Sequence, residues 1–460
     1  MTPRKHFTPR PYQKLITDHI LTHERCAIWA GMGMGKTSGT LNAIDALLLA
    51  EDDPVLVVAP LRVARTTWPD EARKWQHLRG INVVPIVGGQ AERLLALRTP
   101  AQVYTINYEN LPWLVEHWGD RWPYRTVVLD EATKVKGFRL KQGTQRAKAL
   151  AQVAHTHVRR LVQLTGTPSP NGLQDLWGQA WFIDRGQRLG RTYTAFSQRW
   201  FQASHDGYGS TPLGHAQKEI QDLMRDVCLT VDAKDWFDLR EPIVNTIHVD
   251  LPMQARKHYR EMEKAMFTEI ESHQVEAFNA AARTIKCLQI ANGAAYVGEG
   301  SDDWKELHDA KLQALDSIIE EAGGAPVLVA YHFKSDLARL QRAYPDGIHL
   351  SSHAGLRAAQ AGKGRVWFGH PASMGHGVDG LQQHCNILAF FGHWWNLEER
   401  LQMIERIGPT RQMQAGHDRP VFIHNLVARD TVDELVMARI ETKREVQDLL
   451  LEAMKTRRAS

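Results

Sequence analysis

The chain has little cysteine. Its 460 residues include four cysteines, Cys26, Cys228, Cys287 and Cys385, which lie far apart and form no C-x-x-C pair. This spacing argues against a zinc ribbon, a thiol redox motif and a disulfide scaffold, and it favours a reducing compartment. The 22 histidines form no H-E-x-x-H motif. Scattered core and surface histidines therefore explain them better than metal ligation does.

Long apolar runs are also absent. No stretch of about 18 apolar residues occurs, and the basic amino-terminal sequence MTPRKHFTPRPYQ lacks the apolar segment of a signal peptide. We therefore expect a cytoplasmic protein without a membrane partner. The net charge is only +4, from 56 basic and 52 acidic residues. Such a balance permits a nucleic-acid partner without demanding one.

Short apolar runs alternate with helical patterns in two parts of the chain. The first part, residues 10–185, contains CAIWA, VLVVAP, VYTIN, TVVLDE and LVQLTGT. The second part, from residue 241, contains IVNTIHVDL, APVLVAYHF, GIHLSS, RVWFGH, NILAFFG and PVFIHNLV. Continuous Val/Ile/Leu runs of this kind are typical of parallel strands buried between layers of helices. The pattern predicts an α/β protein with two mostly parallel sheets covered by helices.

The length and the change of composition suggest where the domains divide. A chain of 460 residues is too long for one core. We expect a first domain at 1–188 and a second at 241–460, which includes a helical protrusion at about 252–300. Residues 189–240 mix Arg, Gln, Trp and Gly without a strand rhythm, and they contain the loop-like ASHDGYGSTPLG. They are expected to form a linker or a helical insertion.

The stretch AGMGMGKT follows an apolar run and precedes a helical pattern. Glycines such as Gly33 and Gly35 allow backbone N–H groups to converge on phosphate oxygens at a helix amino end. Lys36 supplies a positive charge to the outer phosphates, and Thr37 supplies a hydroxyl for Mg²⁺. A simple glycine-rich turn is disfavoured, because the lysine, the hydroxyl and the flanking elements all agree. The stretch predicts a phosphate-binding loop.

Polar side chains end two further apolar runs. In TVVLDEATKVKG, Asp130 is placed to hold Mg²⁺ through water, and Glu131 to orient and deprotonate an attacking water. In VQLTGTPSPNGLQDLW, Thr165 and Thr167 stand beside glycine and proline. Each stretch alone could be a polar surface turn. The order of all these segments along the chain is what favours a nucleotide site.

Taken together, these segments resemble those of superfamily-two helicases, specifically the Swi/Snf-type DNA translocases. The resemblance runs from about residue 10 to about residue 437, and it includes VLVVAPLRVARTTWPDEARKW, VYTINYENL and HPASMGHGVDGLQQHCNILAFFG. The compact length looks most like the versions that bacteriophages encode. The resemblance implies two RecA-like domains that bind ATP and Mg²⁺ in the cleft between them, and a DNA-dependent ATPase activity.

The family's nucleotide-binding residues match positions in the first half of this chain. Gln13, 23 residues before Lys36, matches the glutamine that reads adenine, and Arg10 lies beside it. The lysine and threonine of the phosphate loop match the family's phosphate and magnesium residues. Asp130 and Glu131 match its metal carboxylate and catalytic acid.

Other matches imply roles in coupling and in the second half of the site. Thr165 and Thr167 match the segment that couples hydrolysis to domain movement. Gly377 and Asp379 match the nucleotide-facing part of the fifth motif, and Gln402 begins the sixth. The chain departs from the family at Thr133 and at His376, where histidine and an aliphatic residue, respectively, are usual. We assign His376 to loop packing.

The sixth motif has an unusual spacing. In QMIERIGPTRQ the first arginine, Arg406, stands where the family pattern Q-x-x-x-R-x-x-R places it, but Arg411 comes two residues late. On one continuous helix Arg411 would point about 140° from Arg406, whereas a residue three positions after Arg406 would point about 300° from it. Gly408 and Pro409 form a helix-stopping pair, so we expect Arg411 in a loop. Our hypothesis is that both arginines serve the γ-phosphate, with Arg411 as the arginine finger; the alternative is a solvated surface residue.

Several polar residues follow predicted strands, where a ligand crevice is expected. They are candidates for gripping DNA phosphates without reading sequence, although each alone could be a solvated charge: Arg62, Asn107, Tyr108, Lys134, Lys136 and Lys334. Trp394 and Trp395 could stack on bases, but packing is the better interpretation of an aromatic pair after an apolar run.

The resemblance therefore implies an ATP-driven motor that moves along or remodels DNA, duplex or branched, in phage replication, recombination or repair. Its expected location is the host bacterial cytoplasm, and replication or recombination proteins are its candidate partners. Two alternatives stay open. One is an ATP-gated DNA clamp or replisome adaptor with little hydrolysis, and the other is an RNA helicase.

Overall fold

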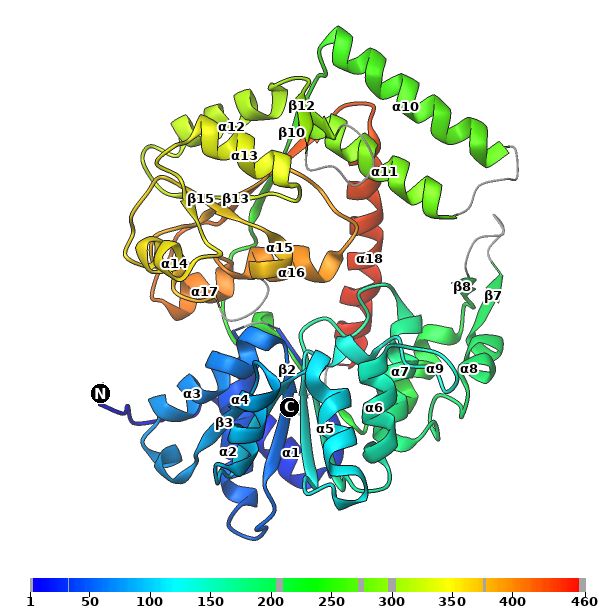
Figure 1. Ribbon diagram of the computed structural model, residues 1–460, viewed down its shortest axis with the longest axis vertical. Helices are drawn as coiled ribbons and strands as arrows, with labels where there is room; N and C mark the ends of the chain where they lie inside the picture. The colour runs from blue at the N-terminus through cyan, green and yellow to red at the C-terminus, as the bar shows by residue number, and fades with distance from the viewer. Residues whose placement is uncertain are drawn as a thin grey trace. The chain divides into compact units, whose positions relative to one another are not determined.

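The computed structural model describes residues 3–31, 33–203, 210–271, 277–296, 303–374 and 378–454. The chain forms two compact units, Met1–Trp236 with Lys443–Ser460 and Phe237–Thr442. Each unit is built around its own parallel sheet, which can be followed in Figure 1. The predicted α/β class with two helix-covered parallel sheets is confirmed.

All strands of the larger sheet in the first unit run parallel. The seven strands, in their order across the sheet, are β3 (Val83–Ile86), β4 (Val103–Asn107), β2 (Val55–Ala59), β5 (Thr126–Asp130), β6 (Arg160–Thr165), β1 (Arg25–Ala30) and β9 (Cys228–Val231). Their side chains are largely buried, as the continuous apolar runs predict. In a parallel sheet all carboxyl ends lie at one edge, so the polar residues that follow β1, β5 and β6 share that edge.

Helices cover both faces of this sheet (Figure 1). They are α1 (Pro11–Thr22), α2 (Lys36–Leu47), α3 (Trp68–Lys74), α4 (Gln90–Arg98), α5 (Leu111–Trp118), α6 (Gln145–Ala154) and α7 (Leu176–Asp184). Leu56 and Leu129 of the sheet share one core cluster with residues of α4 to α7. Because side chains alternate along a strand, Val57 and Val128 point to the opposite face. Helices α1 and α2 contact each other.

Residues 189–240 contribute strands as well as helices to the first unit. The elements are α8 (Tyr193–Trp200), the antiparallel pair β7 (Phe201–Ala203) and β8 (Ser210–Pro212), α9 (Ala216–Met224) and β9. The segment expected to be a linker or a helical insertion thus contains short strands beside helices α8 and α9. Strands of three or four residues are too short to give a detectable period, and β9 becomes a strand by pairing with β1.

The second unit contains a parallel sheet of six strands. Across the sheet they are β10 (Ile243–Val249), β17 (Phe422–Ala428), β16 (Ile387–Phe390), β13 (Val327–Ala330), β15 (Val366–Gly369) and β14 (Ile348–His349). Each lies in one of the apolar runs that predicted it. Alternate residues of the central strands belong to two core clusters, one on each face.

The helices of the second unit pack on these two faces or extend from them. They are α10 (Met253–Glu271), α11 (Ala277–Asn292), α12 (Ala310–Glu321), α13 (Lys334–Ala343), α14 (His353–Gln360), α15 (Pro371–Met374), α16 (Leu397–Glu405), α17 (Pro409–Gln414) and α18 (Val432–Met454), of which the part from Lys443 belongs to the first unit. Helices α12 and α13 share one core cluster with the sheet, and α14 and α16 share the other. The antiparallel pair β11 (Ala294–Tyr296) and β12 (Trp304–Glu306) follows α11.

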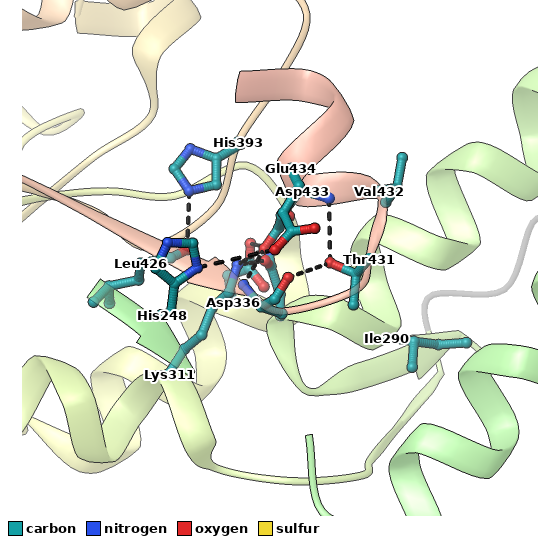
Figure 2. A network of polar contacts seen from close by, with 12 residues as sticks. His248, Ile290, Lys311, Asp336, His393, Leu426, Thr431, Val432, Asp433 and Glu434 are labelled. Atoms are coloured by element: carbon teal, nitrogen blue, oxygen red, sulfur yellow. Dashed lines mark hydrogen bonds and ion pairs between the residues drawn. The ribbon is translucent and has the colours of Figure 1, made fainter. Parts of the chain in front are cut away.

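A buried polar network joins four elements of the second unit. Lys311 of α12 forms an ion pair with Asp433 near the start of α18, with 2.6 Å between Nζ and Oδ2, and both side chains are fully buried. Lys311 also donates to Asn292 Oδ1 at 2.8 Å, and Asn292 donates to Asp336 Oδ2 at 3.0 Å. Figure 2 shows Lys311 pointing toward Asp433. Because burial of an unpaired charge is costly, this network ties α11, α12, α13 and α18 together.

Candidate functional site

The segment predicted to be the phosphate loop joins β1 to α2. It leaves β1 at Ala30, contains Gly33 and Gly35 with φ angles of 78° and 66°, and enters α2 at Lys36. Such positive φ angles are open to glycine at little steric cost. The Lys36 Nζ donates to the carbonyl oxygens of Ala30 and Gly31 at 2.6 and 3.1 Å. The lysine therefore spans its own loop, where a phosphate would compete with these carbonyls for the ammonium group.

Gln13 lies directly against this loop. Its Nε2 donates to Ser38 Oγ at 2.9 Å, its Oε1 accepts the Arg10 N–H at 2.8 Å, and Ser38 Oγ donates to the Gly35 carbonyl at 3.0 Å. A Cβ at Gly35 would stand 2.3 Å from Gln13 Nε2. A larger residue at position 35 would therefore require the Gln13 side chain to shift.

The two acids lie at the carboxyl end of β5. Asp130 and Glu131 are buried, and Glu131 has a left-handed backbone with φ 59°. The indole Nε1 of Trp68 donates to Asp130 Oδ2 at 2.9 Å. Burial raises the pKa of the Asp130 carboxyl, while the Trp68 hydrogen bond and the charge of Lys36 act in the opposite direction. Lys36 and Asp130 are therefore close enough to interact electrostatically.

The donors at this edge of the sheet fit a magnesium ion. Thr37 is the second residue of α2, and it supplies a hydroxyl beside the phosphate loop, while Asp130 supplies a carboxylate. In the described part of the chain no group of three or more His, Cys, Asp or Glu side chains could hold a metal. Mg²⁺ in nucleotide sites is held by one or two protein oxygens together with phosphates and water. A sparse set of hard oxygen donors is what such an ion needs.

The threonines after β6 stand beside the strand that leads into the phosphate loop. Thr165 pairs in register with Trp29 of β1 and is fully buried. Its hydroxyl accepts the Thr167 N–H at 3.1 Å. The Thr167 hydroxyl is buried without a hydrogen-bond partner among the described residues. This pair is thus one strand away from the nucleotide loop, a position that suits the coupling role implied by the resemblance.

The sixth motif is broken as its sequence suggests, but Arg411 does not lie in a loop. Helix α16 ends at Glu405, and a new helix, α17, begins at Pro409 and contains Arg411. The expectation of a loop is therefore wrong. Proline is favoured in the first turn of a helix, since its missing N–H would have no partner there. Pro409 thus stops one helix and starts the next.

Arg406 and Arg411 converge on one short segment of the second unit. The Nη1 of Arg406 donates to the Val378 carbonyl at 2.6 Å, and the Nη1 of Arg411 pairs with Asp379 Oδ1 at 2.6 Å. Burial would raise the pKa of Asp379, but the charge of Arg411 and the Gly380 N–H outweigh it, so the pKa is lowered. The side chain of Arg411 is 16% exposed and ion-paired, which disfavours the alternative of a solvated surface residue.

Some of the other residues that the sequence singled out have well-defined contacts, and others lie outside the described residues. Gln402 is buried and donates to Glu398 Oε1 at 3.3 Å. Gly377 and His376 lie outside the described residues. Thr133, at the departure from the family pattern, is buried after β5. Trp394 stacks on His332 with 5.9 Å between ring centroids, in agreement with packing rather than base stacking.

The candidate DNA contacts differ in exposure. Arg62 is half-buried before the π-helical turn Val63–Thr67, and Lys134 is half-buried after the two acids. Lys136 forms an ion pair with Asp175 at 3.4 Å, and Lys334 is exposed at the start of α13. Trp395 is half-buried and packs against a core cluster.

Asn107 and Tyr108, the remaining two candidates, are buried at the end of β4. Asn107 donates to Glu109 Oε2 at 2.9 Å, and the Tyr108 hydroxyl donates to the carbonyls of Asp130 and Glu131 at 2.9 and 3.3 Å. Their side chains do not face solvent in this structure. Trp68 could not be recognised from the sequence, since no spacing rule relates a tryptophan after β2 to a carboxylate after β5.

Several known proteins are similar to this chain. Residues 19–294, more than half of the chain, match the family model described as the SNF2-related domain. The chain is 57% identical to a protein named p41 from Acyrthosiphon pisum secondary endosymbiont phage 1, over 98% of this chain and 99% of that one. It is 32% identical to Helicase SWR1 of Mycosarcoma maydis over 38% of this chain, which is 10% of that protein.

Two further similarities extend along nearly the whole chain. YwqA of Bacillus subtilis, named as a candidate ATP-dependent helicase/translocase, is 21% identical over 97% of this chain and 49% of its own length. The structure titled "Sulfolobus solfataricus SWI2/SNF2 ATPase core in complex with dsDNA" aligns with a TM-score of 0.45 at 21% identity, over 98% of this chain and 95% of that one. The chain thus spans half or less of SWR1 and YwqA.

A glycine-rich turn with a lysine and a pair of acids, both after strands of one parallel sheet, are features that P-loop ATPases share. The family match is more specific, because it covers more than half of the chain. The chain belongs to the SNF2-related domain family, and it is an ATPase of the helicase/translocase type. In the described residues no helix is both long and apolar enough to cross a membrane.

Proposed function

We propose that this ATPase moves along or remodels DNA. In this proposal, residues at the carboxyl ends of the strands of the first sheet hydrolyse the ATP that drives the movement. The observation that carries the proposal is the grouping of Lys36, Thr37, Asp130 and Glu131 at the carboxyl ends of β1 and β5. The relative SWR1 is named a helicase, which supports a nucleic acid as the second substrate. Arg62 and Lys334 follow strands β2 and β13 and supply cations for its phosphates.

Each residue of the site has a defined task in this proposal. Backbone N–H groups of the phosphate loop and the amino end of α2 bind the phosphates, and Lys36 turns from the loop carbonyls to the outer phosphates. Thr37 and Asp130 hold Mg²⁺, which when bound neutralises charge on the phosphates. Glu131 orients the attacking water and accepts its proton. Gln13 reads the adenine, with Arg10 beside it.

The second unit contributes the arginines in the proposal. Arg406 and Arg411 stabilise the charge that develops on the γ-phosphoryl group, with Arg411 as the finger. Gln402 and the Asp379 segment hold these two side chains, as their local hydrogen bonds support. The 57% identity to a phage protein supports a role in phage DNA replication, recombination or repair in a bacterial cytoplasm.

Steady-state ATP hydrolysis with and without duplex DNA tests the proposal. We expect stimulation by duplex DNA and loss of hydrolysis in Lys36→Ala and Glu131→Gln, whereas Lys218→Ala, an exposed lysine on α9, keeps full activity. Tight DNA binding without hydrolysis would replace the motor by an ATP-gated clamp. Stimulation by RNA but not by DNA would replace it by an RNA helicase.

A further inference from the structure

Two buried aromatic side chains hold the acidic end of β5. Trp68 and Tyr108 are 0% and 1% exposed. The Trp68 indole N–H binds the carboxylate of Asp130 at 2.9 Å. The Tyr108 hydroxyl donates to the backbone carbonyls of Asp130 and Glu131 at 2.9 and 3.3 Å. One aromatic residue therefore contacts the side chain of the first acid, and the other contacts the backbone of both.

These contacts come from three neighbouring strand ends. In the sheet β2 lies between β4 and β5. Trp68 opens α3 after β2, Tyr108 follows β4 directly, and Asp130 ends β5. The Thr105 hydroxyl of β4 donates to the Ala64 carbonyl at 2.6 Å, inside the turn that precedes Trp68. The two aromatic residues are thus fixed to each other through the backbone as well as to the acids.

The backbone at Glu131 needs this support. A residue with a Cβ disfavours the left-handed region, and Glu131 adopts it with φ 59°. Residues in such conformations persist where their surroundings hold them. The Tyr108 hydroxyl binds both carbonyls at this turn, so it opposes relaxation of the turn. The orientation of the Glu131 side chain depends on the same turn.

We propose that Trp68 and Tyr108 are positioning residues for the nucleotide site: Trp68 fixes the Asp130 carboxylate in the orientation that holds Mg²⁺, and Tyr108 fixes the backbone that aims Glu131. The proposal rests on the function proposed above. Partners of metal ligands are typically worth about 10- to 100-fold in metal affinity or activity. The proposal also gives Tyr108 a role inside the nucleotide site in place of the DNA contact predicted from the sequence.

Trp68→Phe tests the first half, because it keeps an aromatic ring and removes the N–H. Binding of the fluorescent nucleotide mant-ATP is measured in a magnesium titration and again in excess chelator. We expect the magnesium concentration for half-maximal tight binding to rise about 10- to 100-fold, with unchanged binding in chelator. Unchanged magnesium dependence overturns the role of Trp68. Weaker binding in chelator as well as in magnesium also overturns it, since that result indicates general damage.

A matched control for this variant is Trp200→Phe. Trp200 is also buried, and its indole N–H also donates to a carboxylate, Glu219 Oε2, at 2.9 Å, but in helices α8 and α9. It should leave nucleotide binding and its magnesium dependence unchanged. If Trp200→Phe changed the magnesium dependence as much as Trp68→Phe, the effect would be nonspecific and the proposal would fail.

Tyr108→Phe tests the second half, and it remains informative if Trp68→Phe does not fold. We expect a 10-fold or larger loss of ATP turnover, about the range for supporting residues, with unchanged DNA affinity. Tyr104→Phe is the control, because the Tyr104 hydroxyl also donates to a backbone carbonyl, that of Thr99 at 2.8 Å. A loss of DNA affinity with full DNA-free turnover would make Tyr108 a DNA contact and overturn the proposal.

The outcomes separate this inference from the function on which it rests. If Asp130→Asn abolishes hydrolysis while Trp68→Phe and Tyr108→Phe behave as the unchanged protein, the motor stands and the positioning role fails. If the unchanged protein hydrolyses no ATP with any nucleic acid, the proposed motor fails. The magnesium dependence of mant-ATP binding then still decides the role of Trp68.

Discussion

Removing the charge of Lys311 should destabilise the second unit strongly. Its ammonium group lies 2.6 Å from Asp433 Oδ2, and both side chains are fully buried. In Lys311→Met a chain of similar length fills the space, but the Asp433 carboxylate loses its cation and keeps the Ala428 N–H at 3.0 Å. Breaking one partner of a buried pair typically costs about 3–5 kcal/mol. We expect a loss of that size in the free energy of unfolding.

The double variant Lys311→Met/Asp433→Asn gives the decisive comparison. It removes both charges and keeps an amide oxygen that can accept the Ala428 N–H. We therefore expect it to be more stable than Lys311→Met alone, and the sum of the two single losses to exceed the double loss by more than about 1 kcal/mol. Urea denaturation followed by circular dichroism measures the free energy of unfolding of the unchanged protein and of each variant.

Two results would refute this reasoning. One is a Lys311→Met variant that loses less than about 1 kcal/mol, which is the cost of an exposed pair rather than a buried one. The other is a double variant whose loss equals the sum of the single losses, because independent sites add and paired charges do not. Either result would mean that the two charges are solvated in the folded protein.

Three further predictions concern pH, the arginine finger and the phosphate loop. Burial lowers the pKa of His332 to about 3, so the unfolded chain binds a proton below about 6.5 while the folded chain does not. Stability should fall as the pH drops from about 6.5, and His332 alone should account for about 2 kcal/mol of the loss at pH 5. His332→Phe should reduce the loss by about that amount in urea titrations at the two pH values, and an unchanged loss contradicts this prediction. Arg411→Ala should lower DNA-stimulated hydrolysis about 10³- to 10⁵-fold, and near-normal activity would reject the finger. Gly35→Ala should weaken mant-ATP binding, because Gly35 has φ +66° and an added Cβ would lie 2.3 Å from Gln13. Gly80→Ala should leave the binding unchanged, because a Cβ there meets no atom within 4 Å. Equal effects of the two substitutions on mant-ATP binding would count against the packing argument.

Much of the fold follows from apolar runs in the sequence. Runs such as VLVVA and TVVLD are continuous because both faces of a parallel sheet are covered, and each became a buried strand. The edge strands β3 and β9 were not predicted, since VVPI and CLTV are short and only partly buried. Short edge strands depend on the neighbour with which they pair, and a local pattern carries no information about that neighbour.

The candidate site, like the fold, was only partly predictable from the sequence. Lys36 and Asp130 could be placed from sequence, because both follow strands whose carboxyl ends share one edge of the sheet. Tyr108 was also placed correctly after a strand, but its burial depends on α3 and on the acidic turn, which sequence order does not reveal. For Arg411, the sequence predicted that the preceding helix ends before Pro409, but it did not predict that a new helix begins at Pro409.

The most direct test of the motor is displacement of a third strand from a DNA triplex. A protein that moves along the duplex should release a triplex-forming oligonucleotide in the presence of ATP and magnesium. Glu131→Gln, which keeps the shape of the site but cannot accept the proton, should bind the same DNA without releasing the strand. Equal release by Glu131→Gln, or no release by the unchanged protein while DNA stimulates its hydrolysis, would contradict ATP-driven movement along DNA.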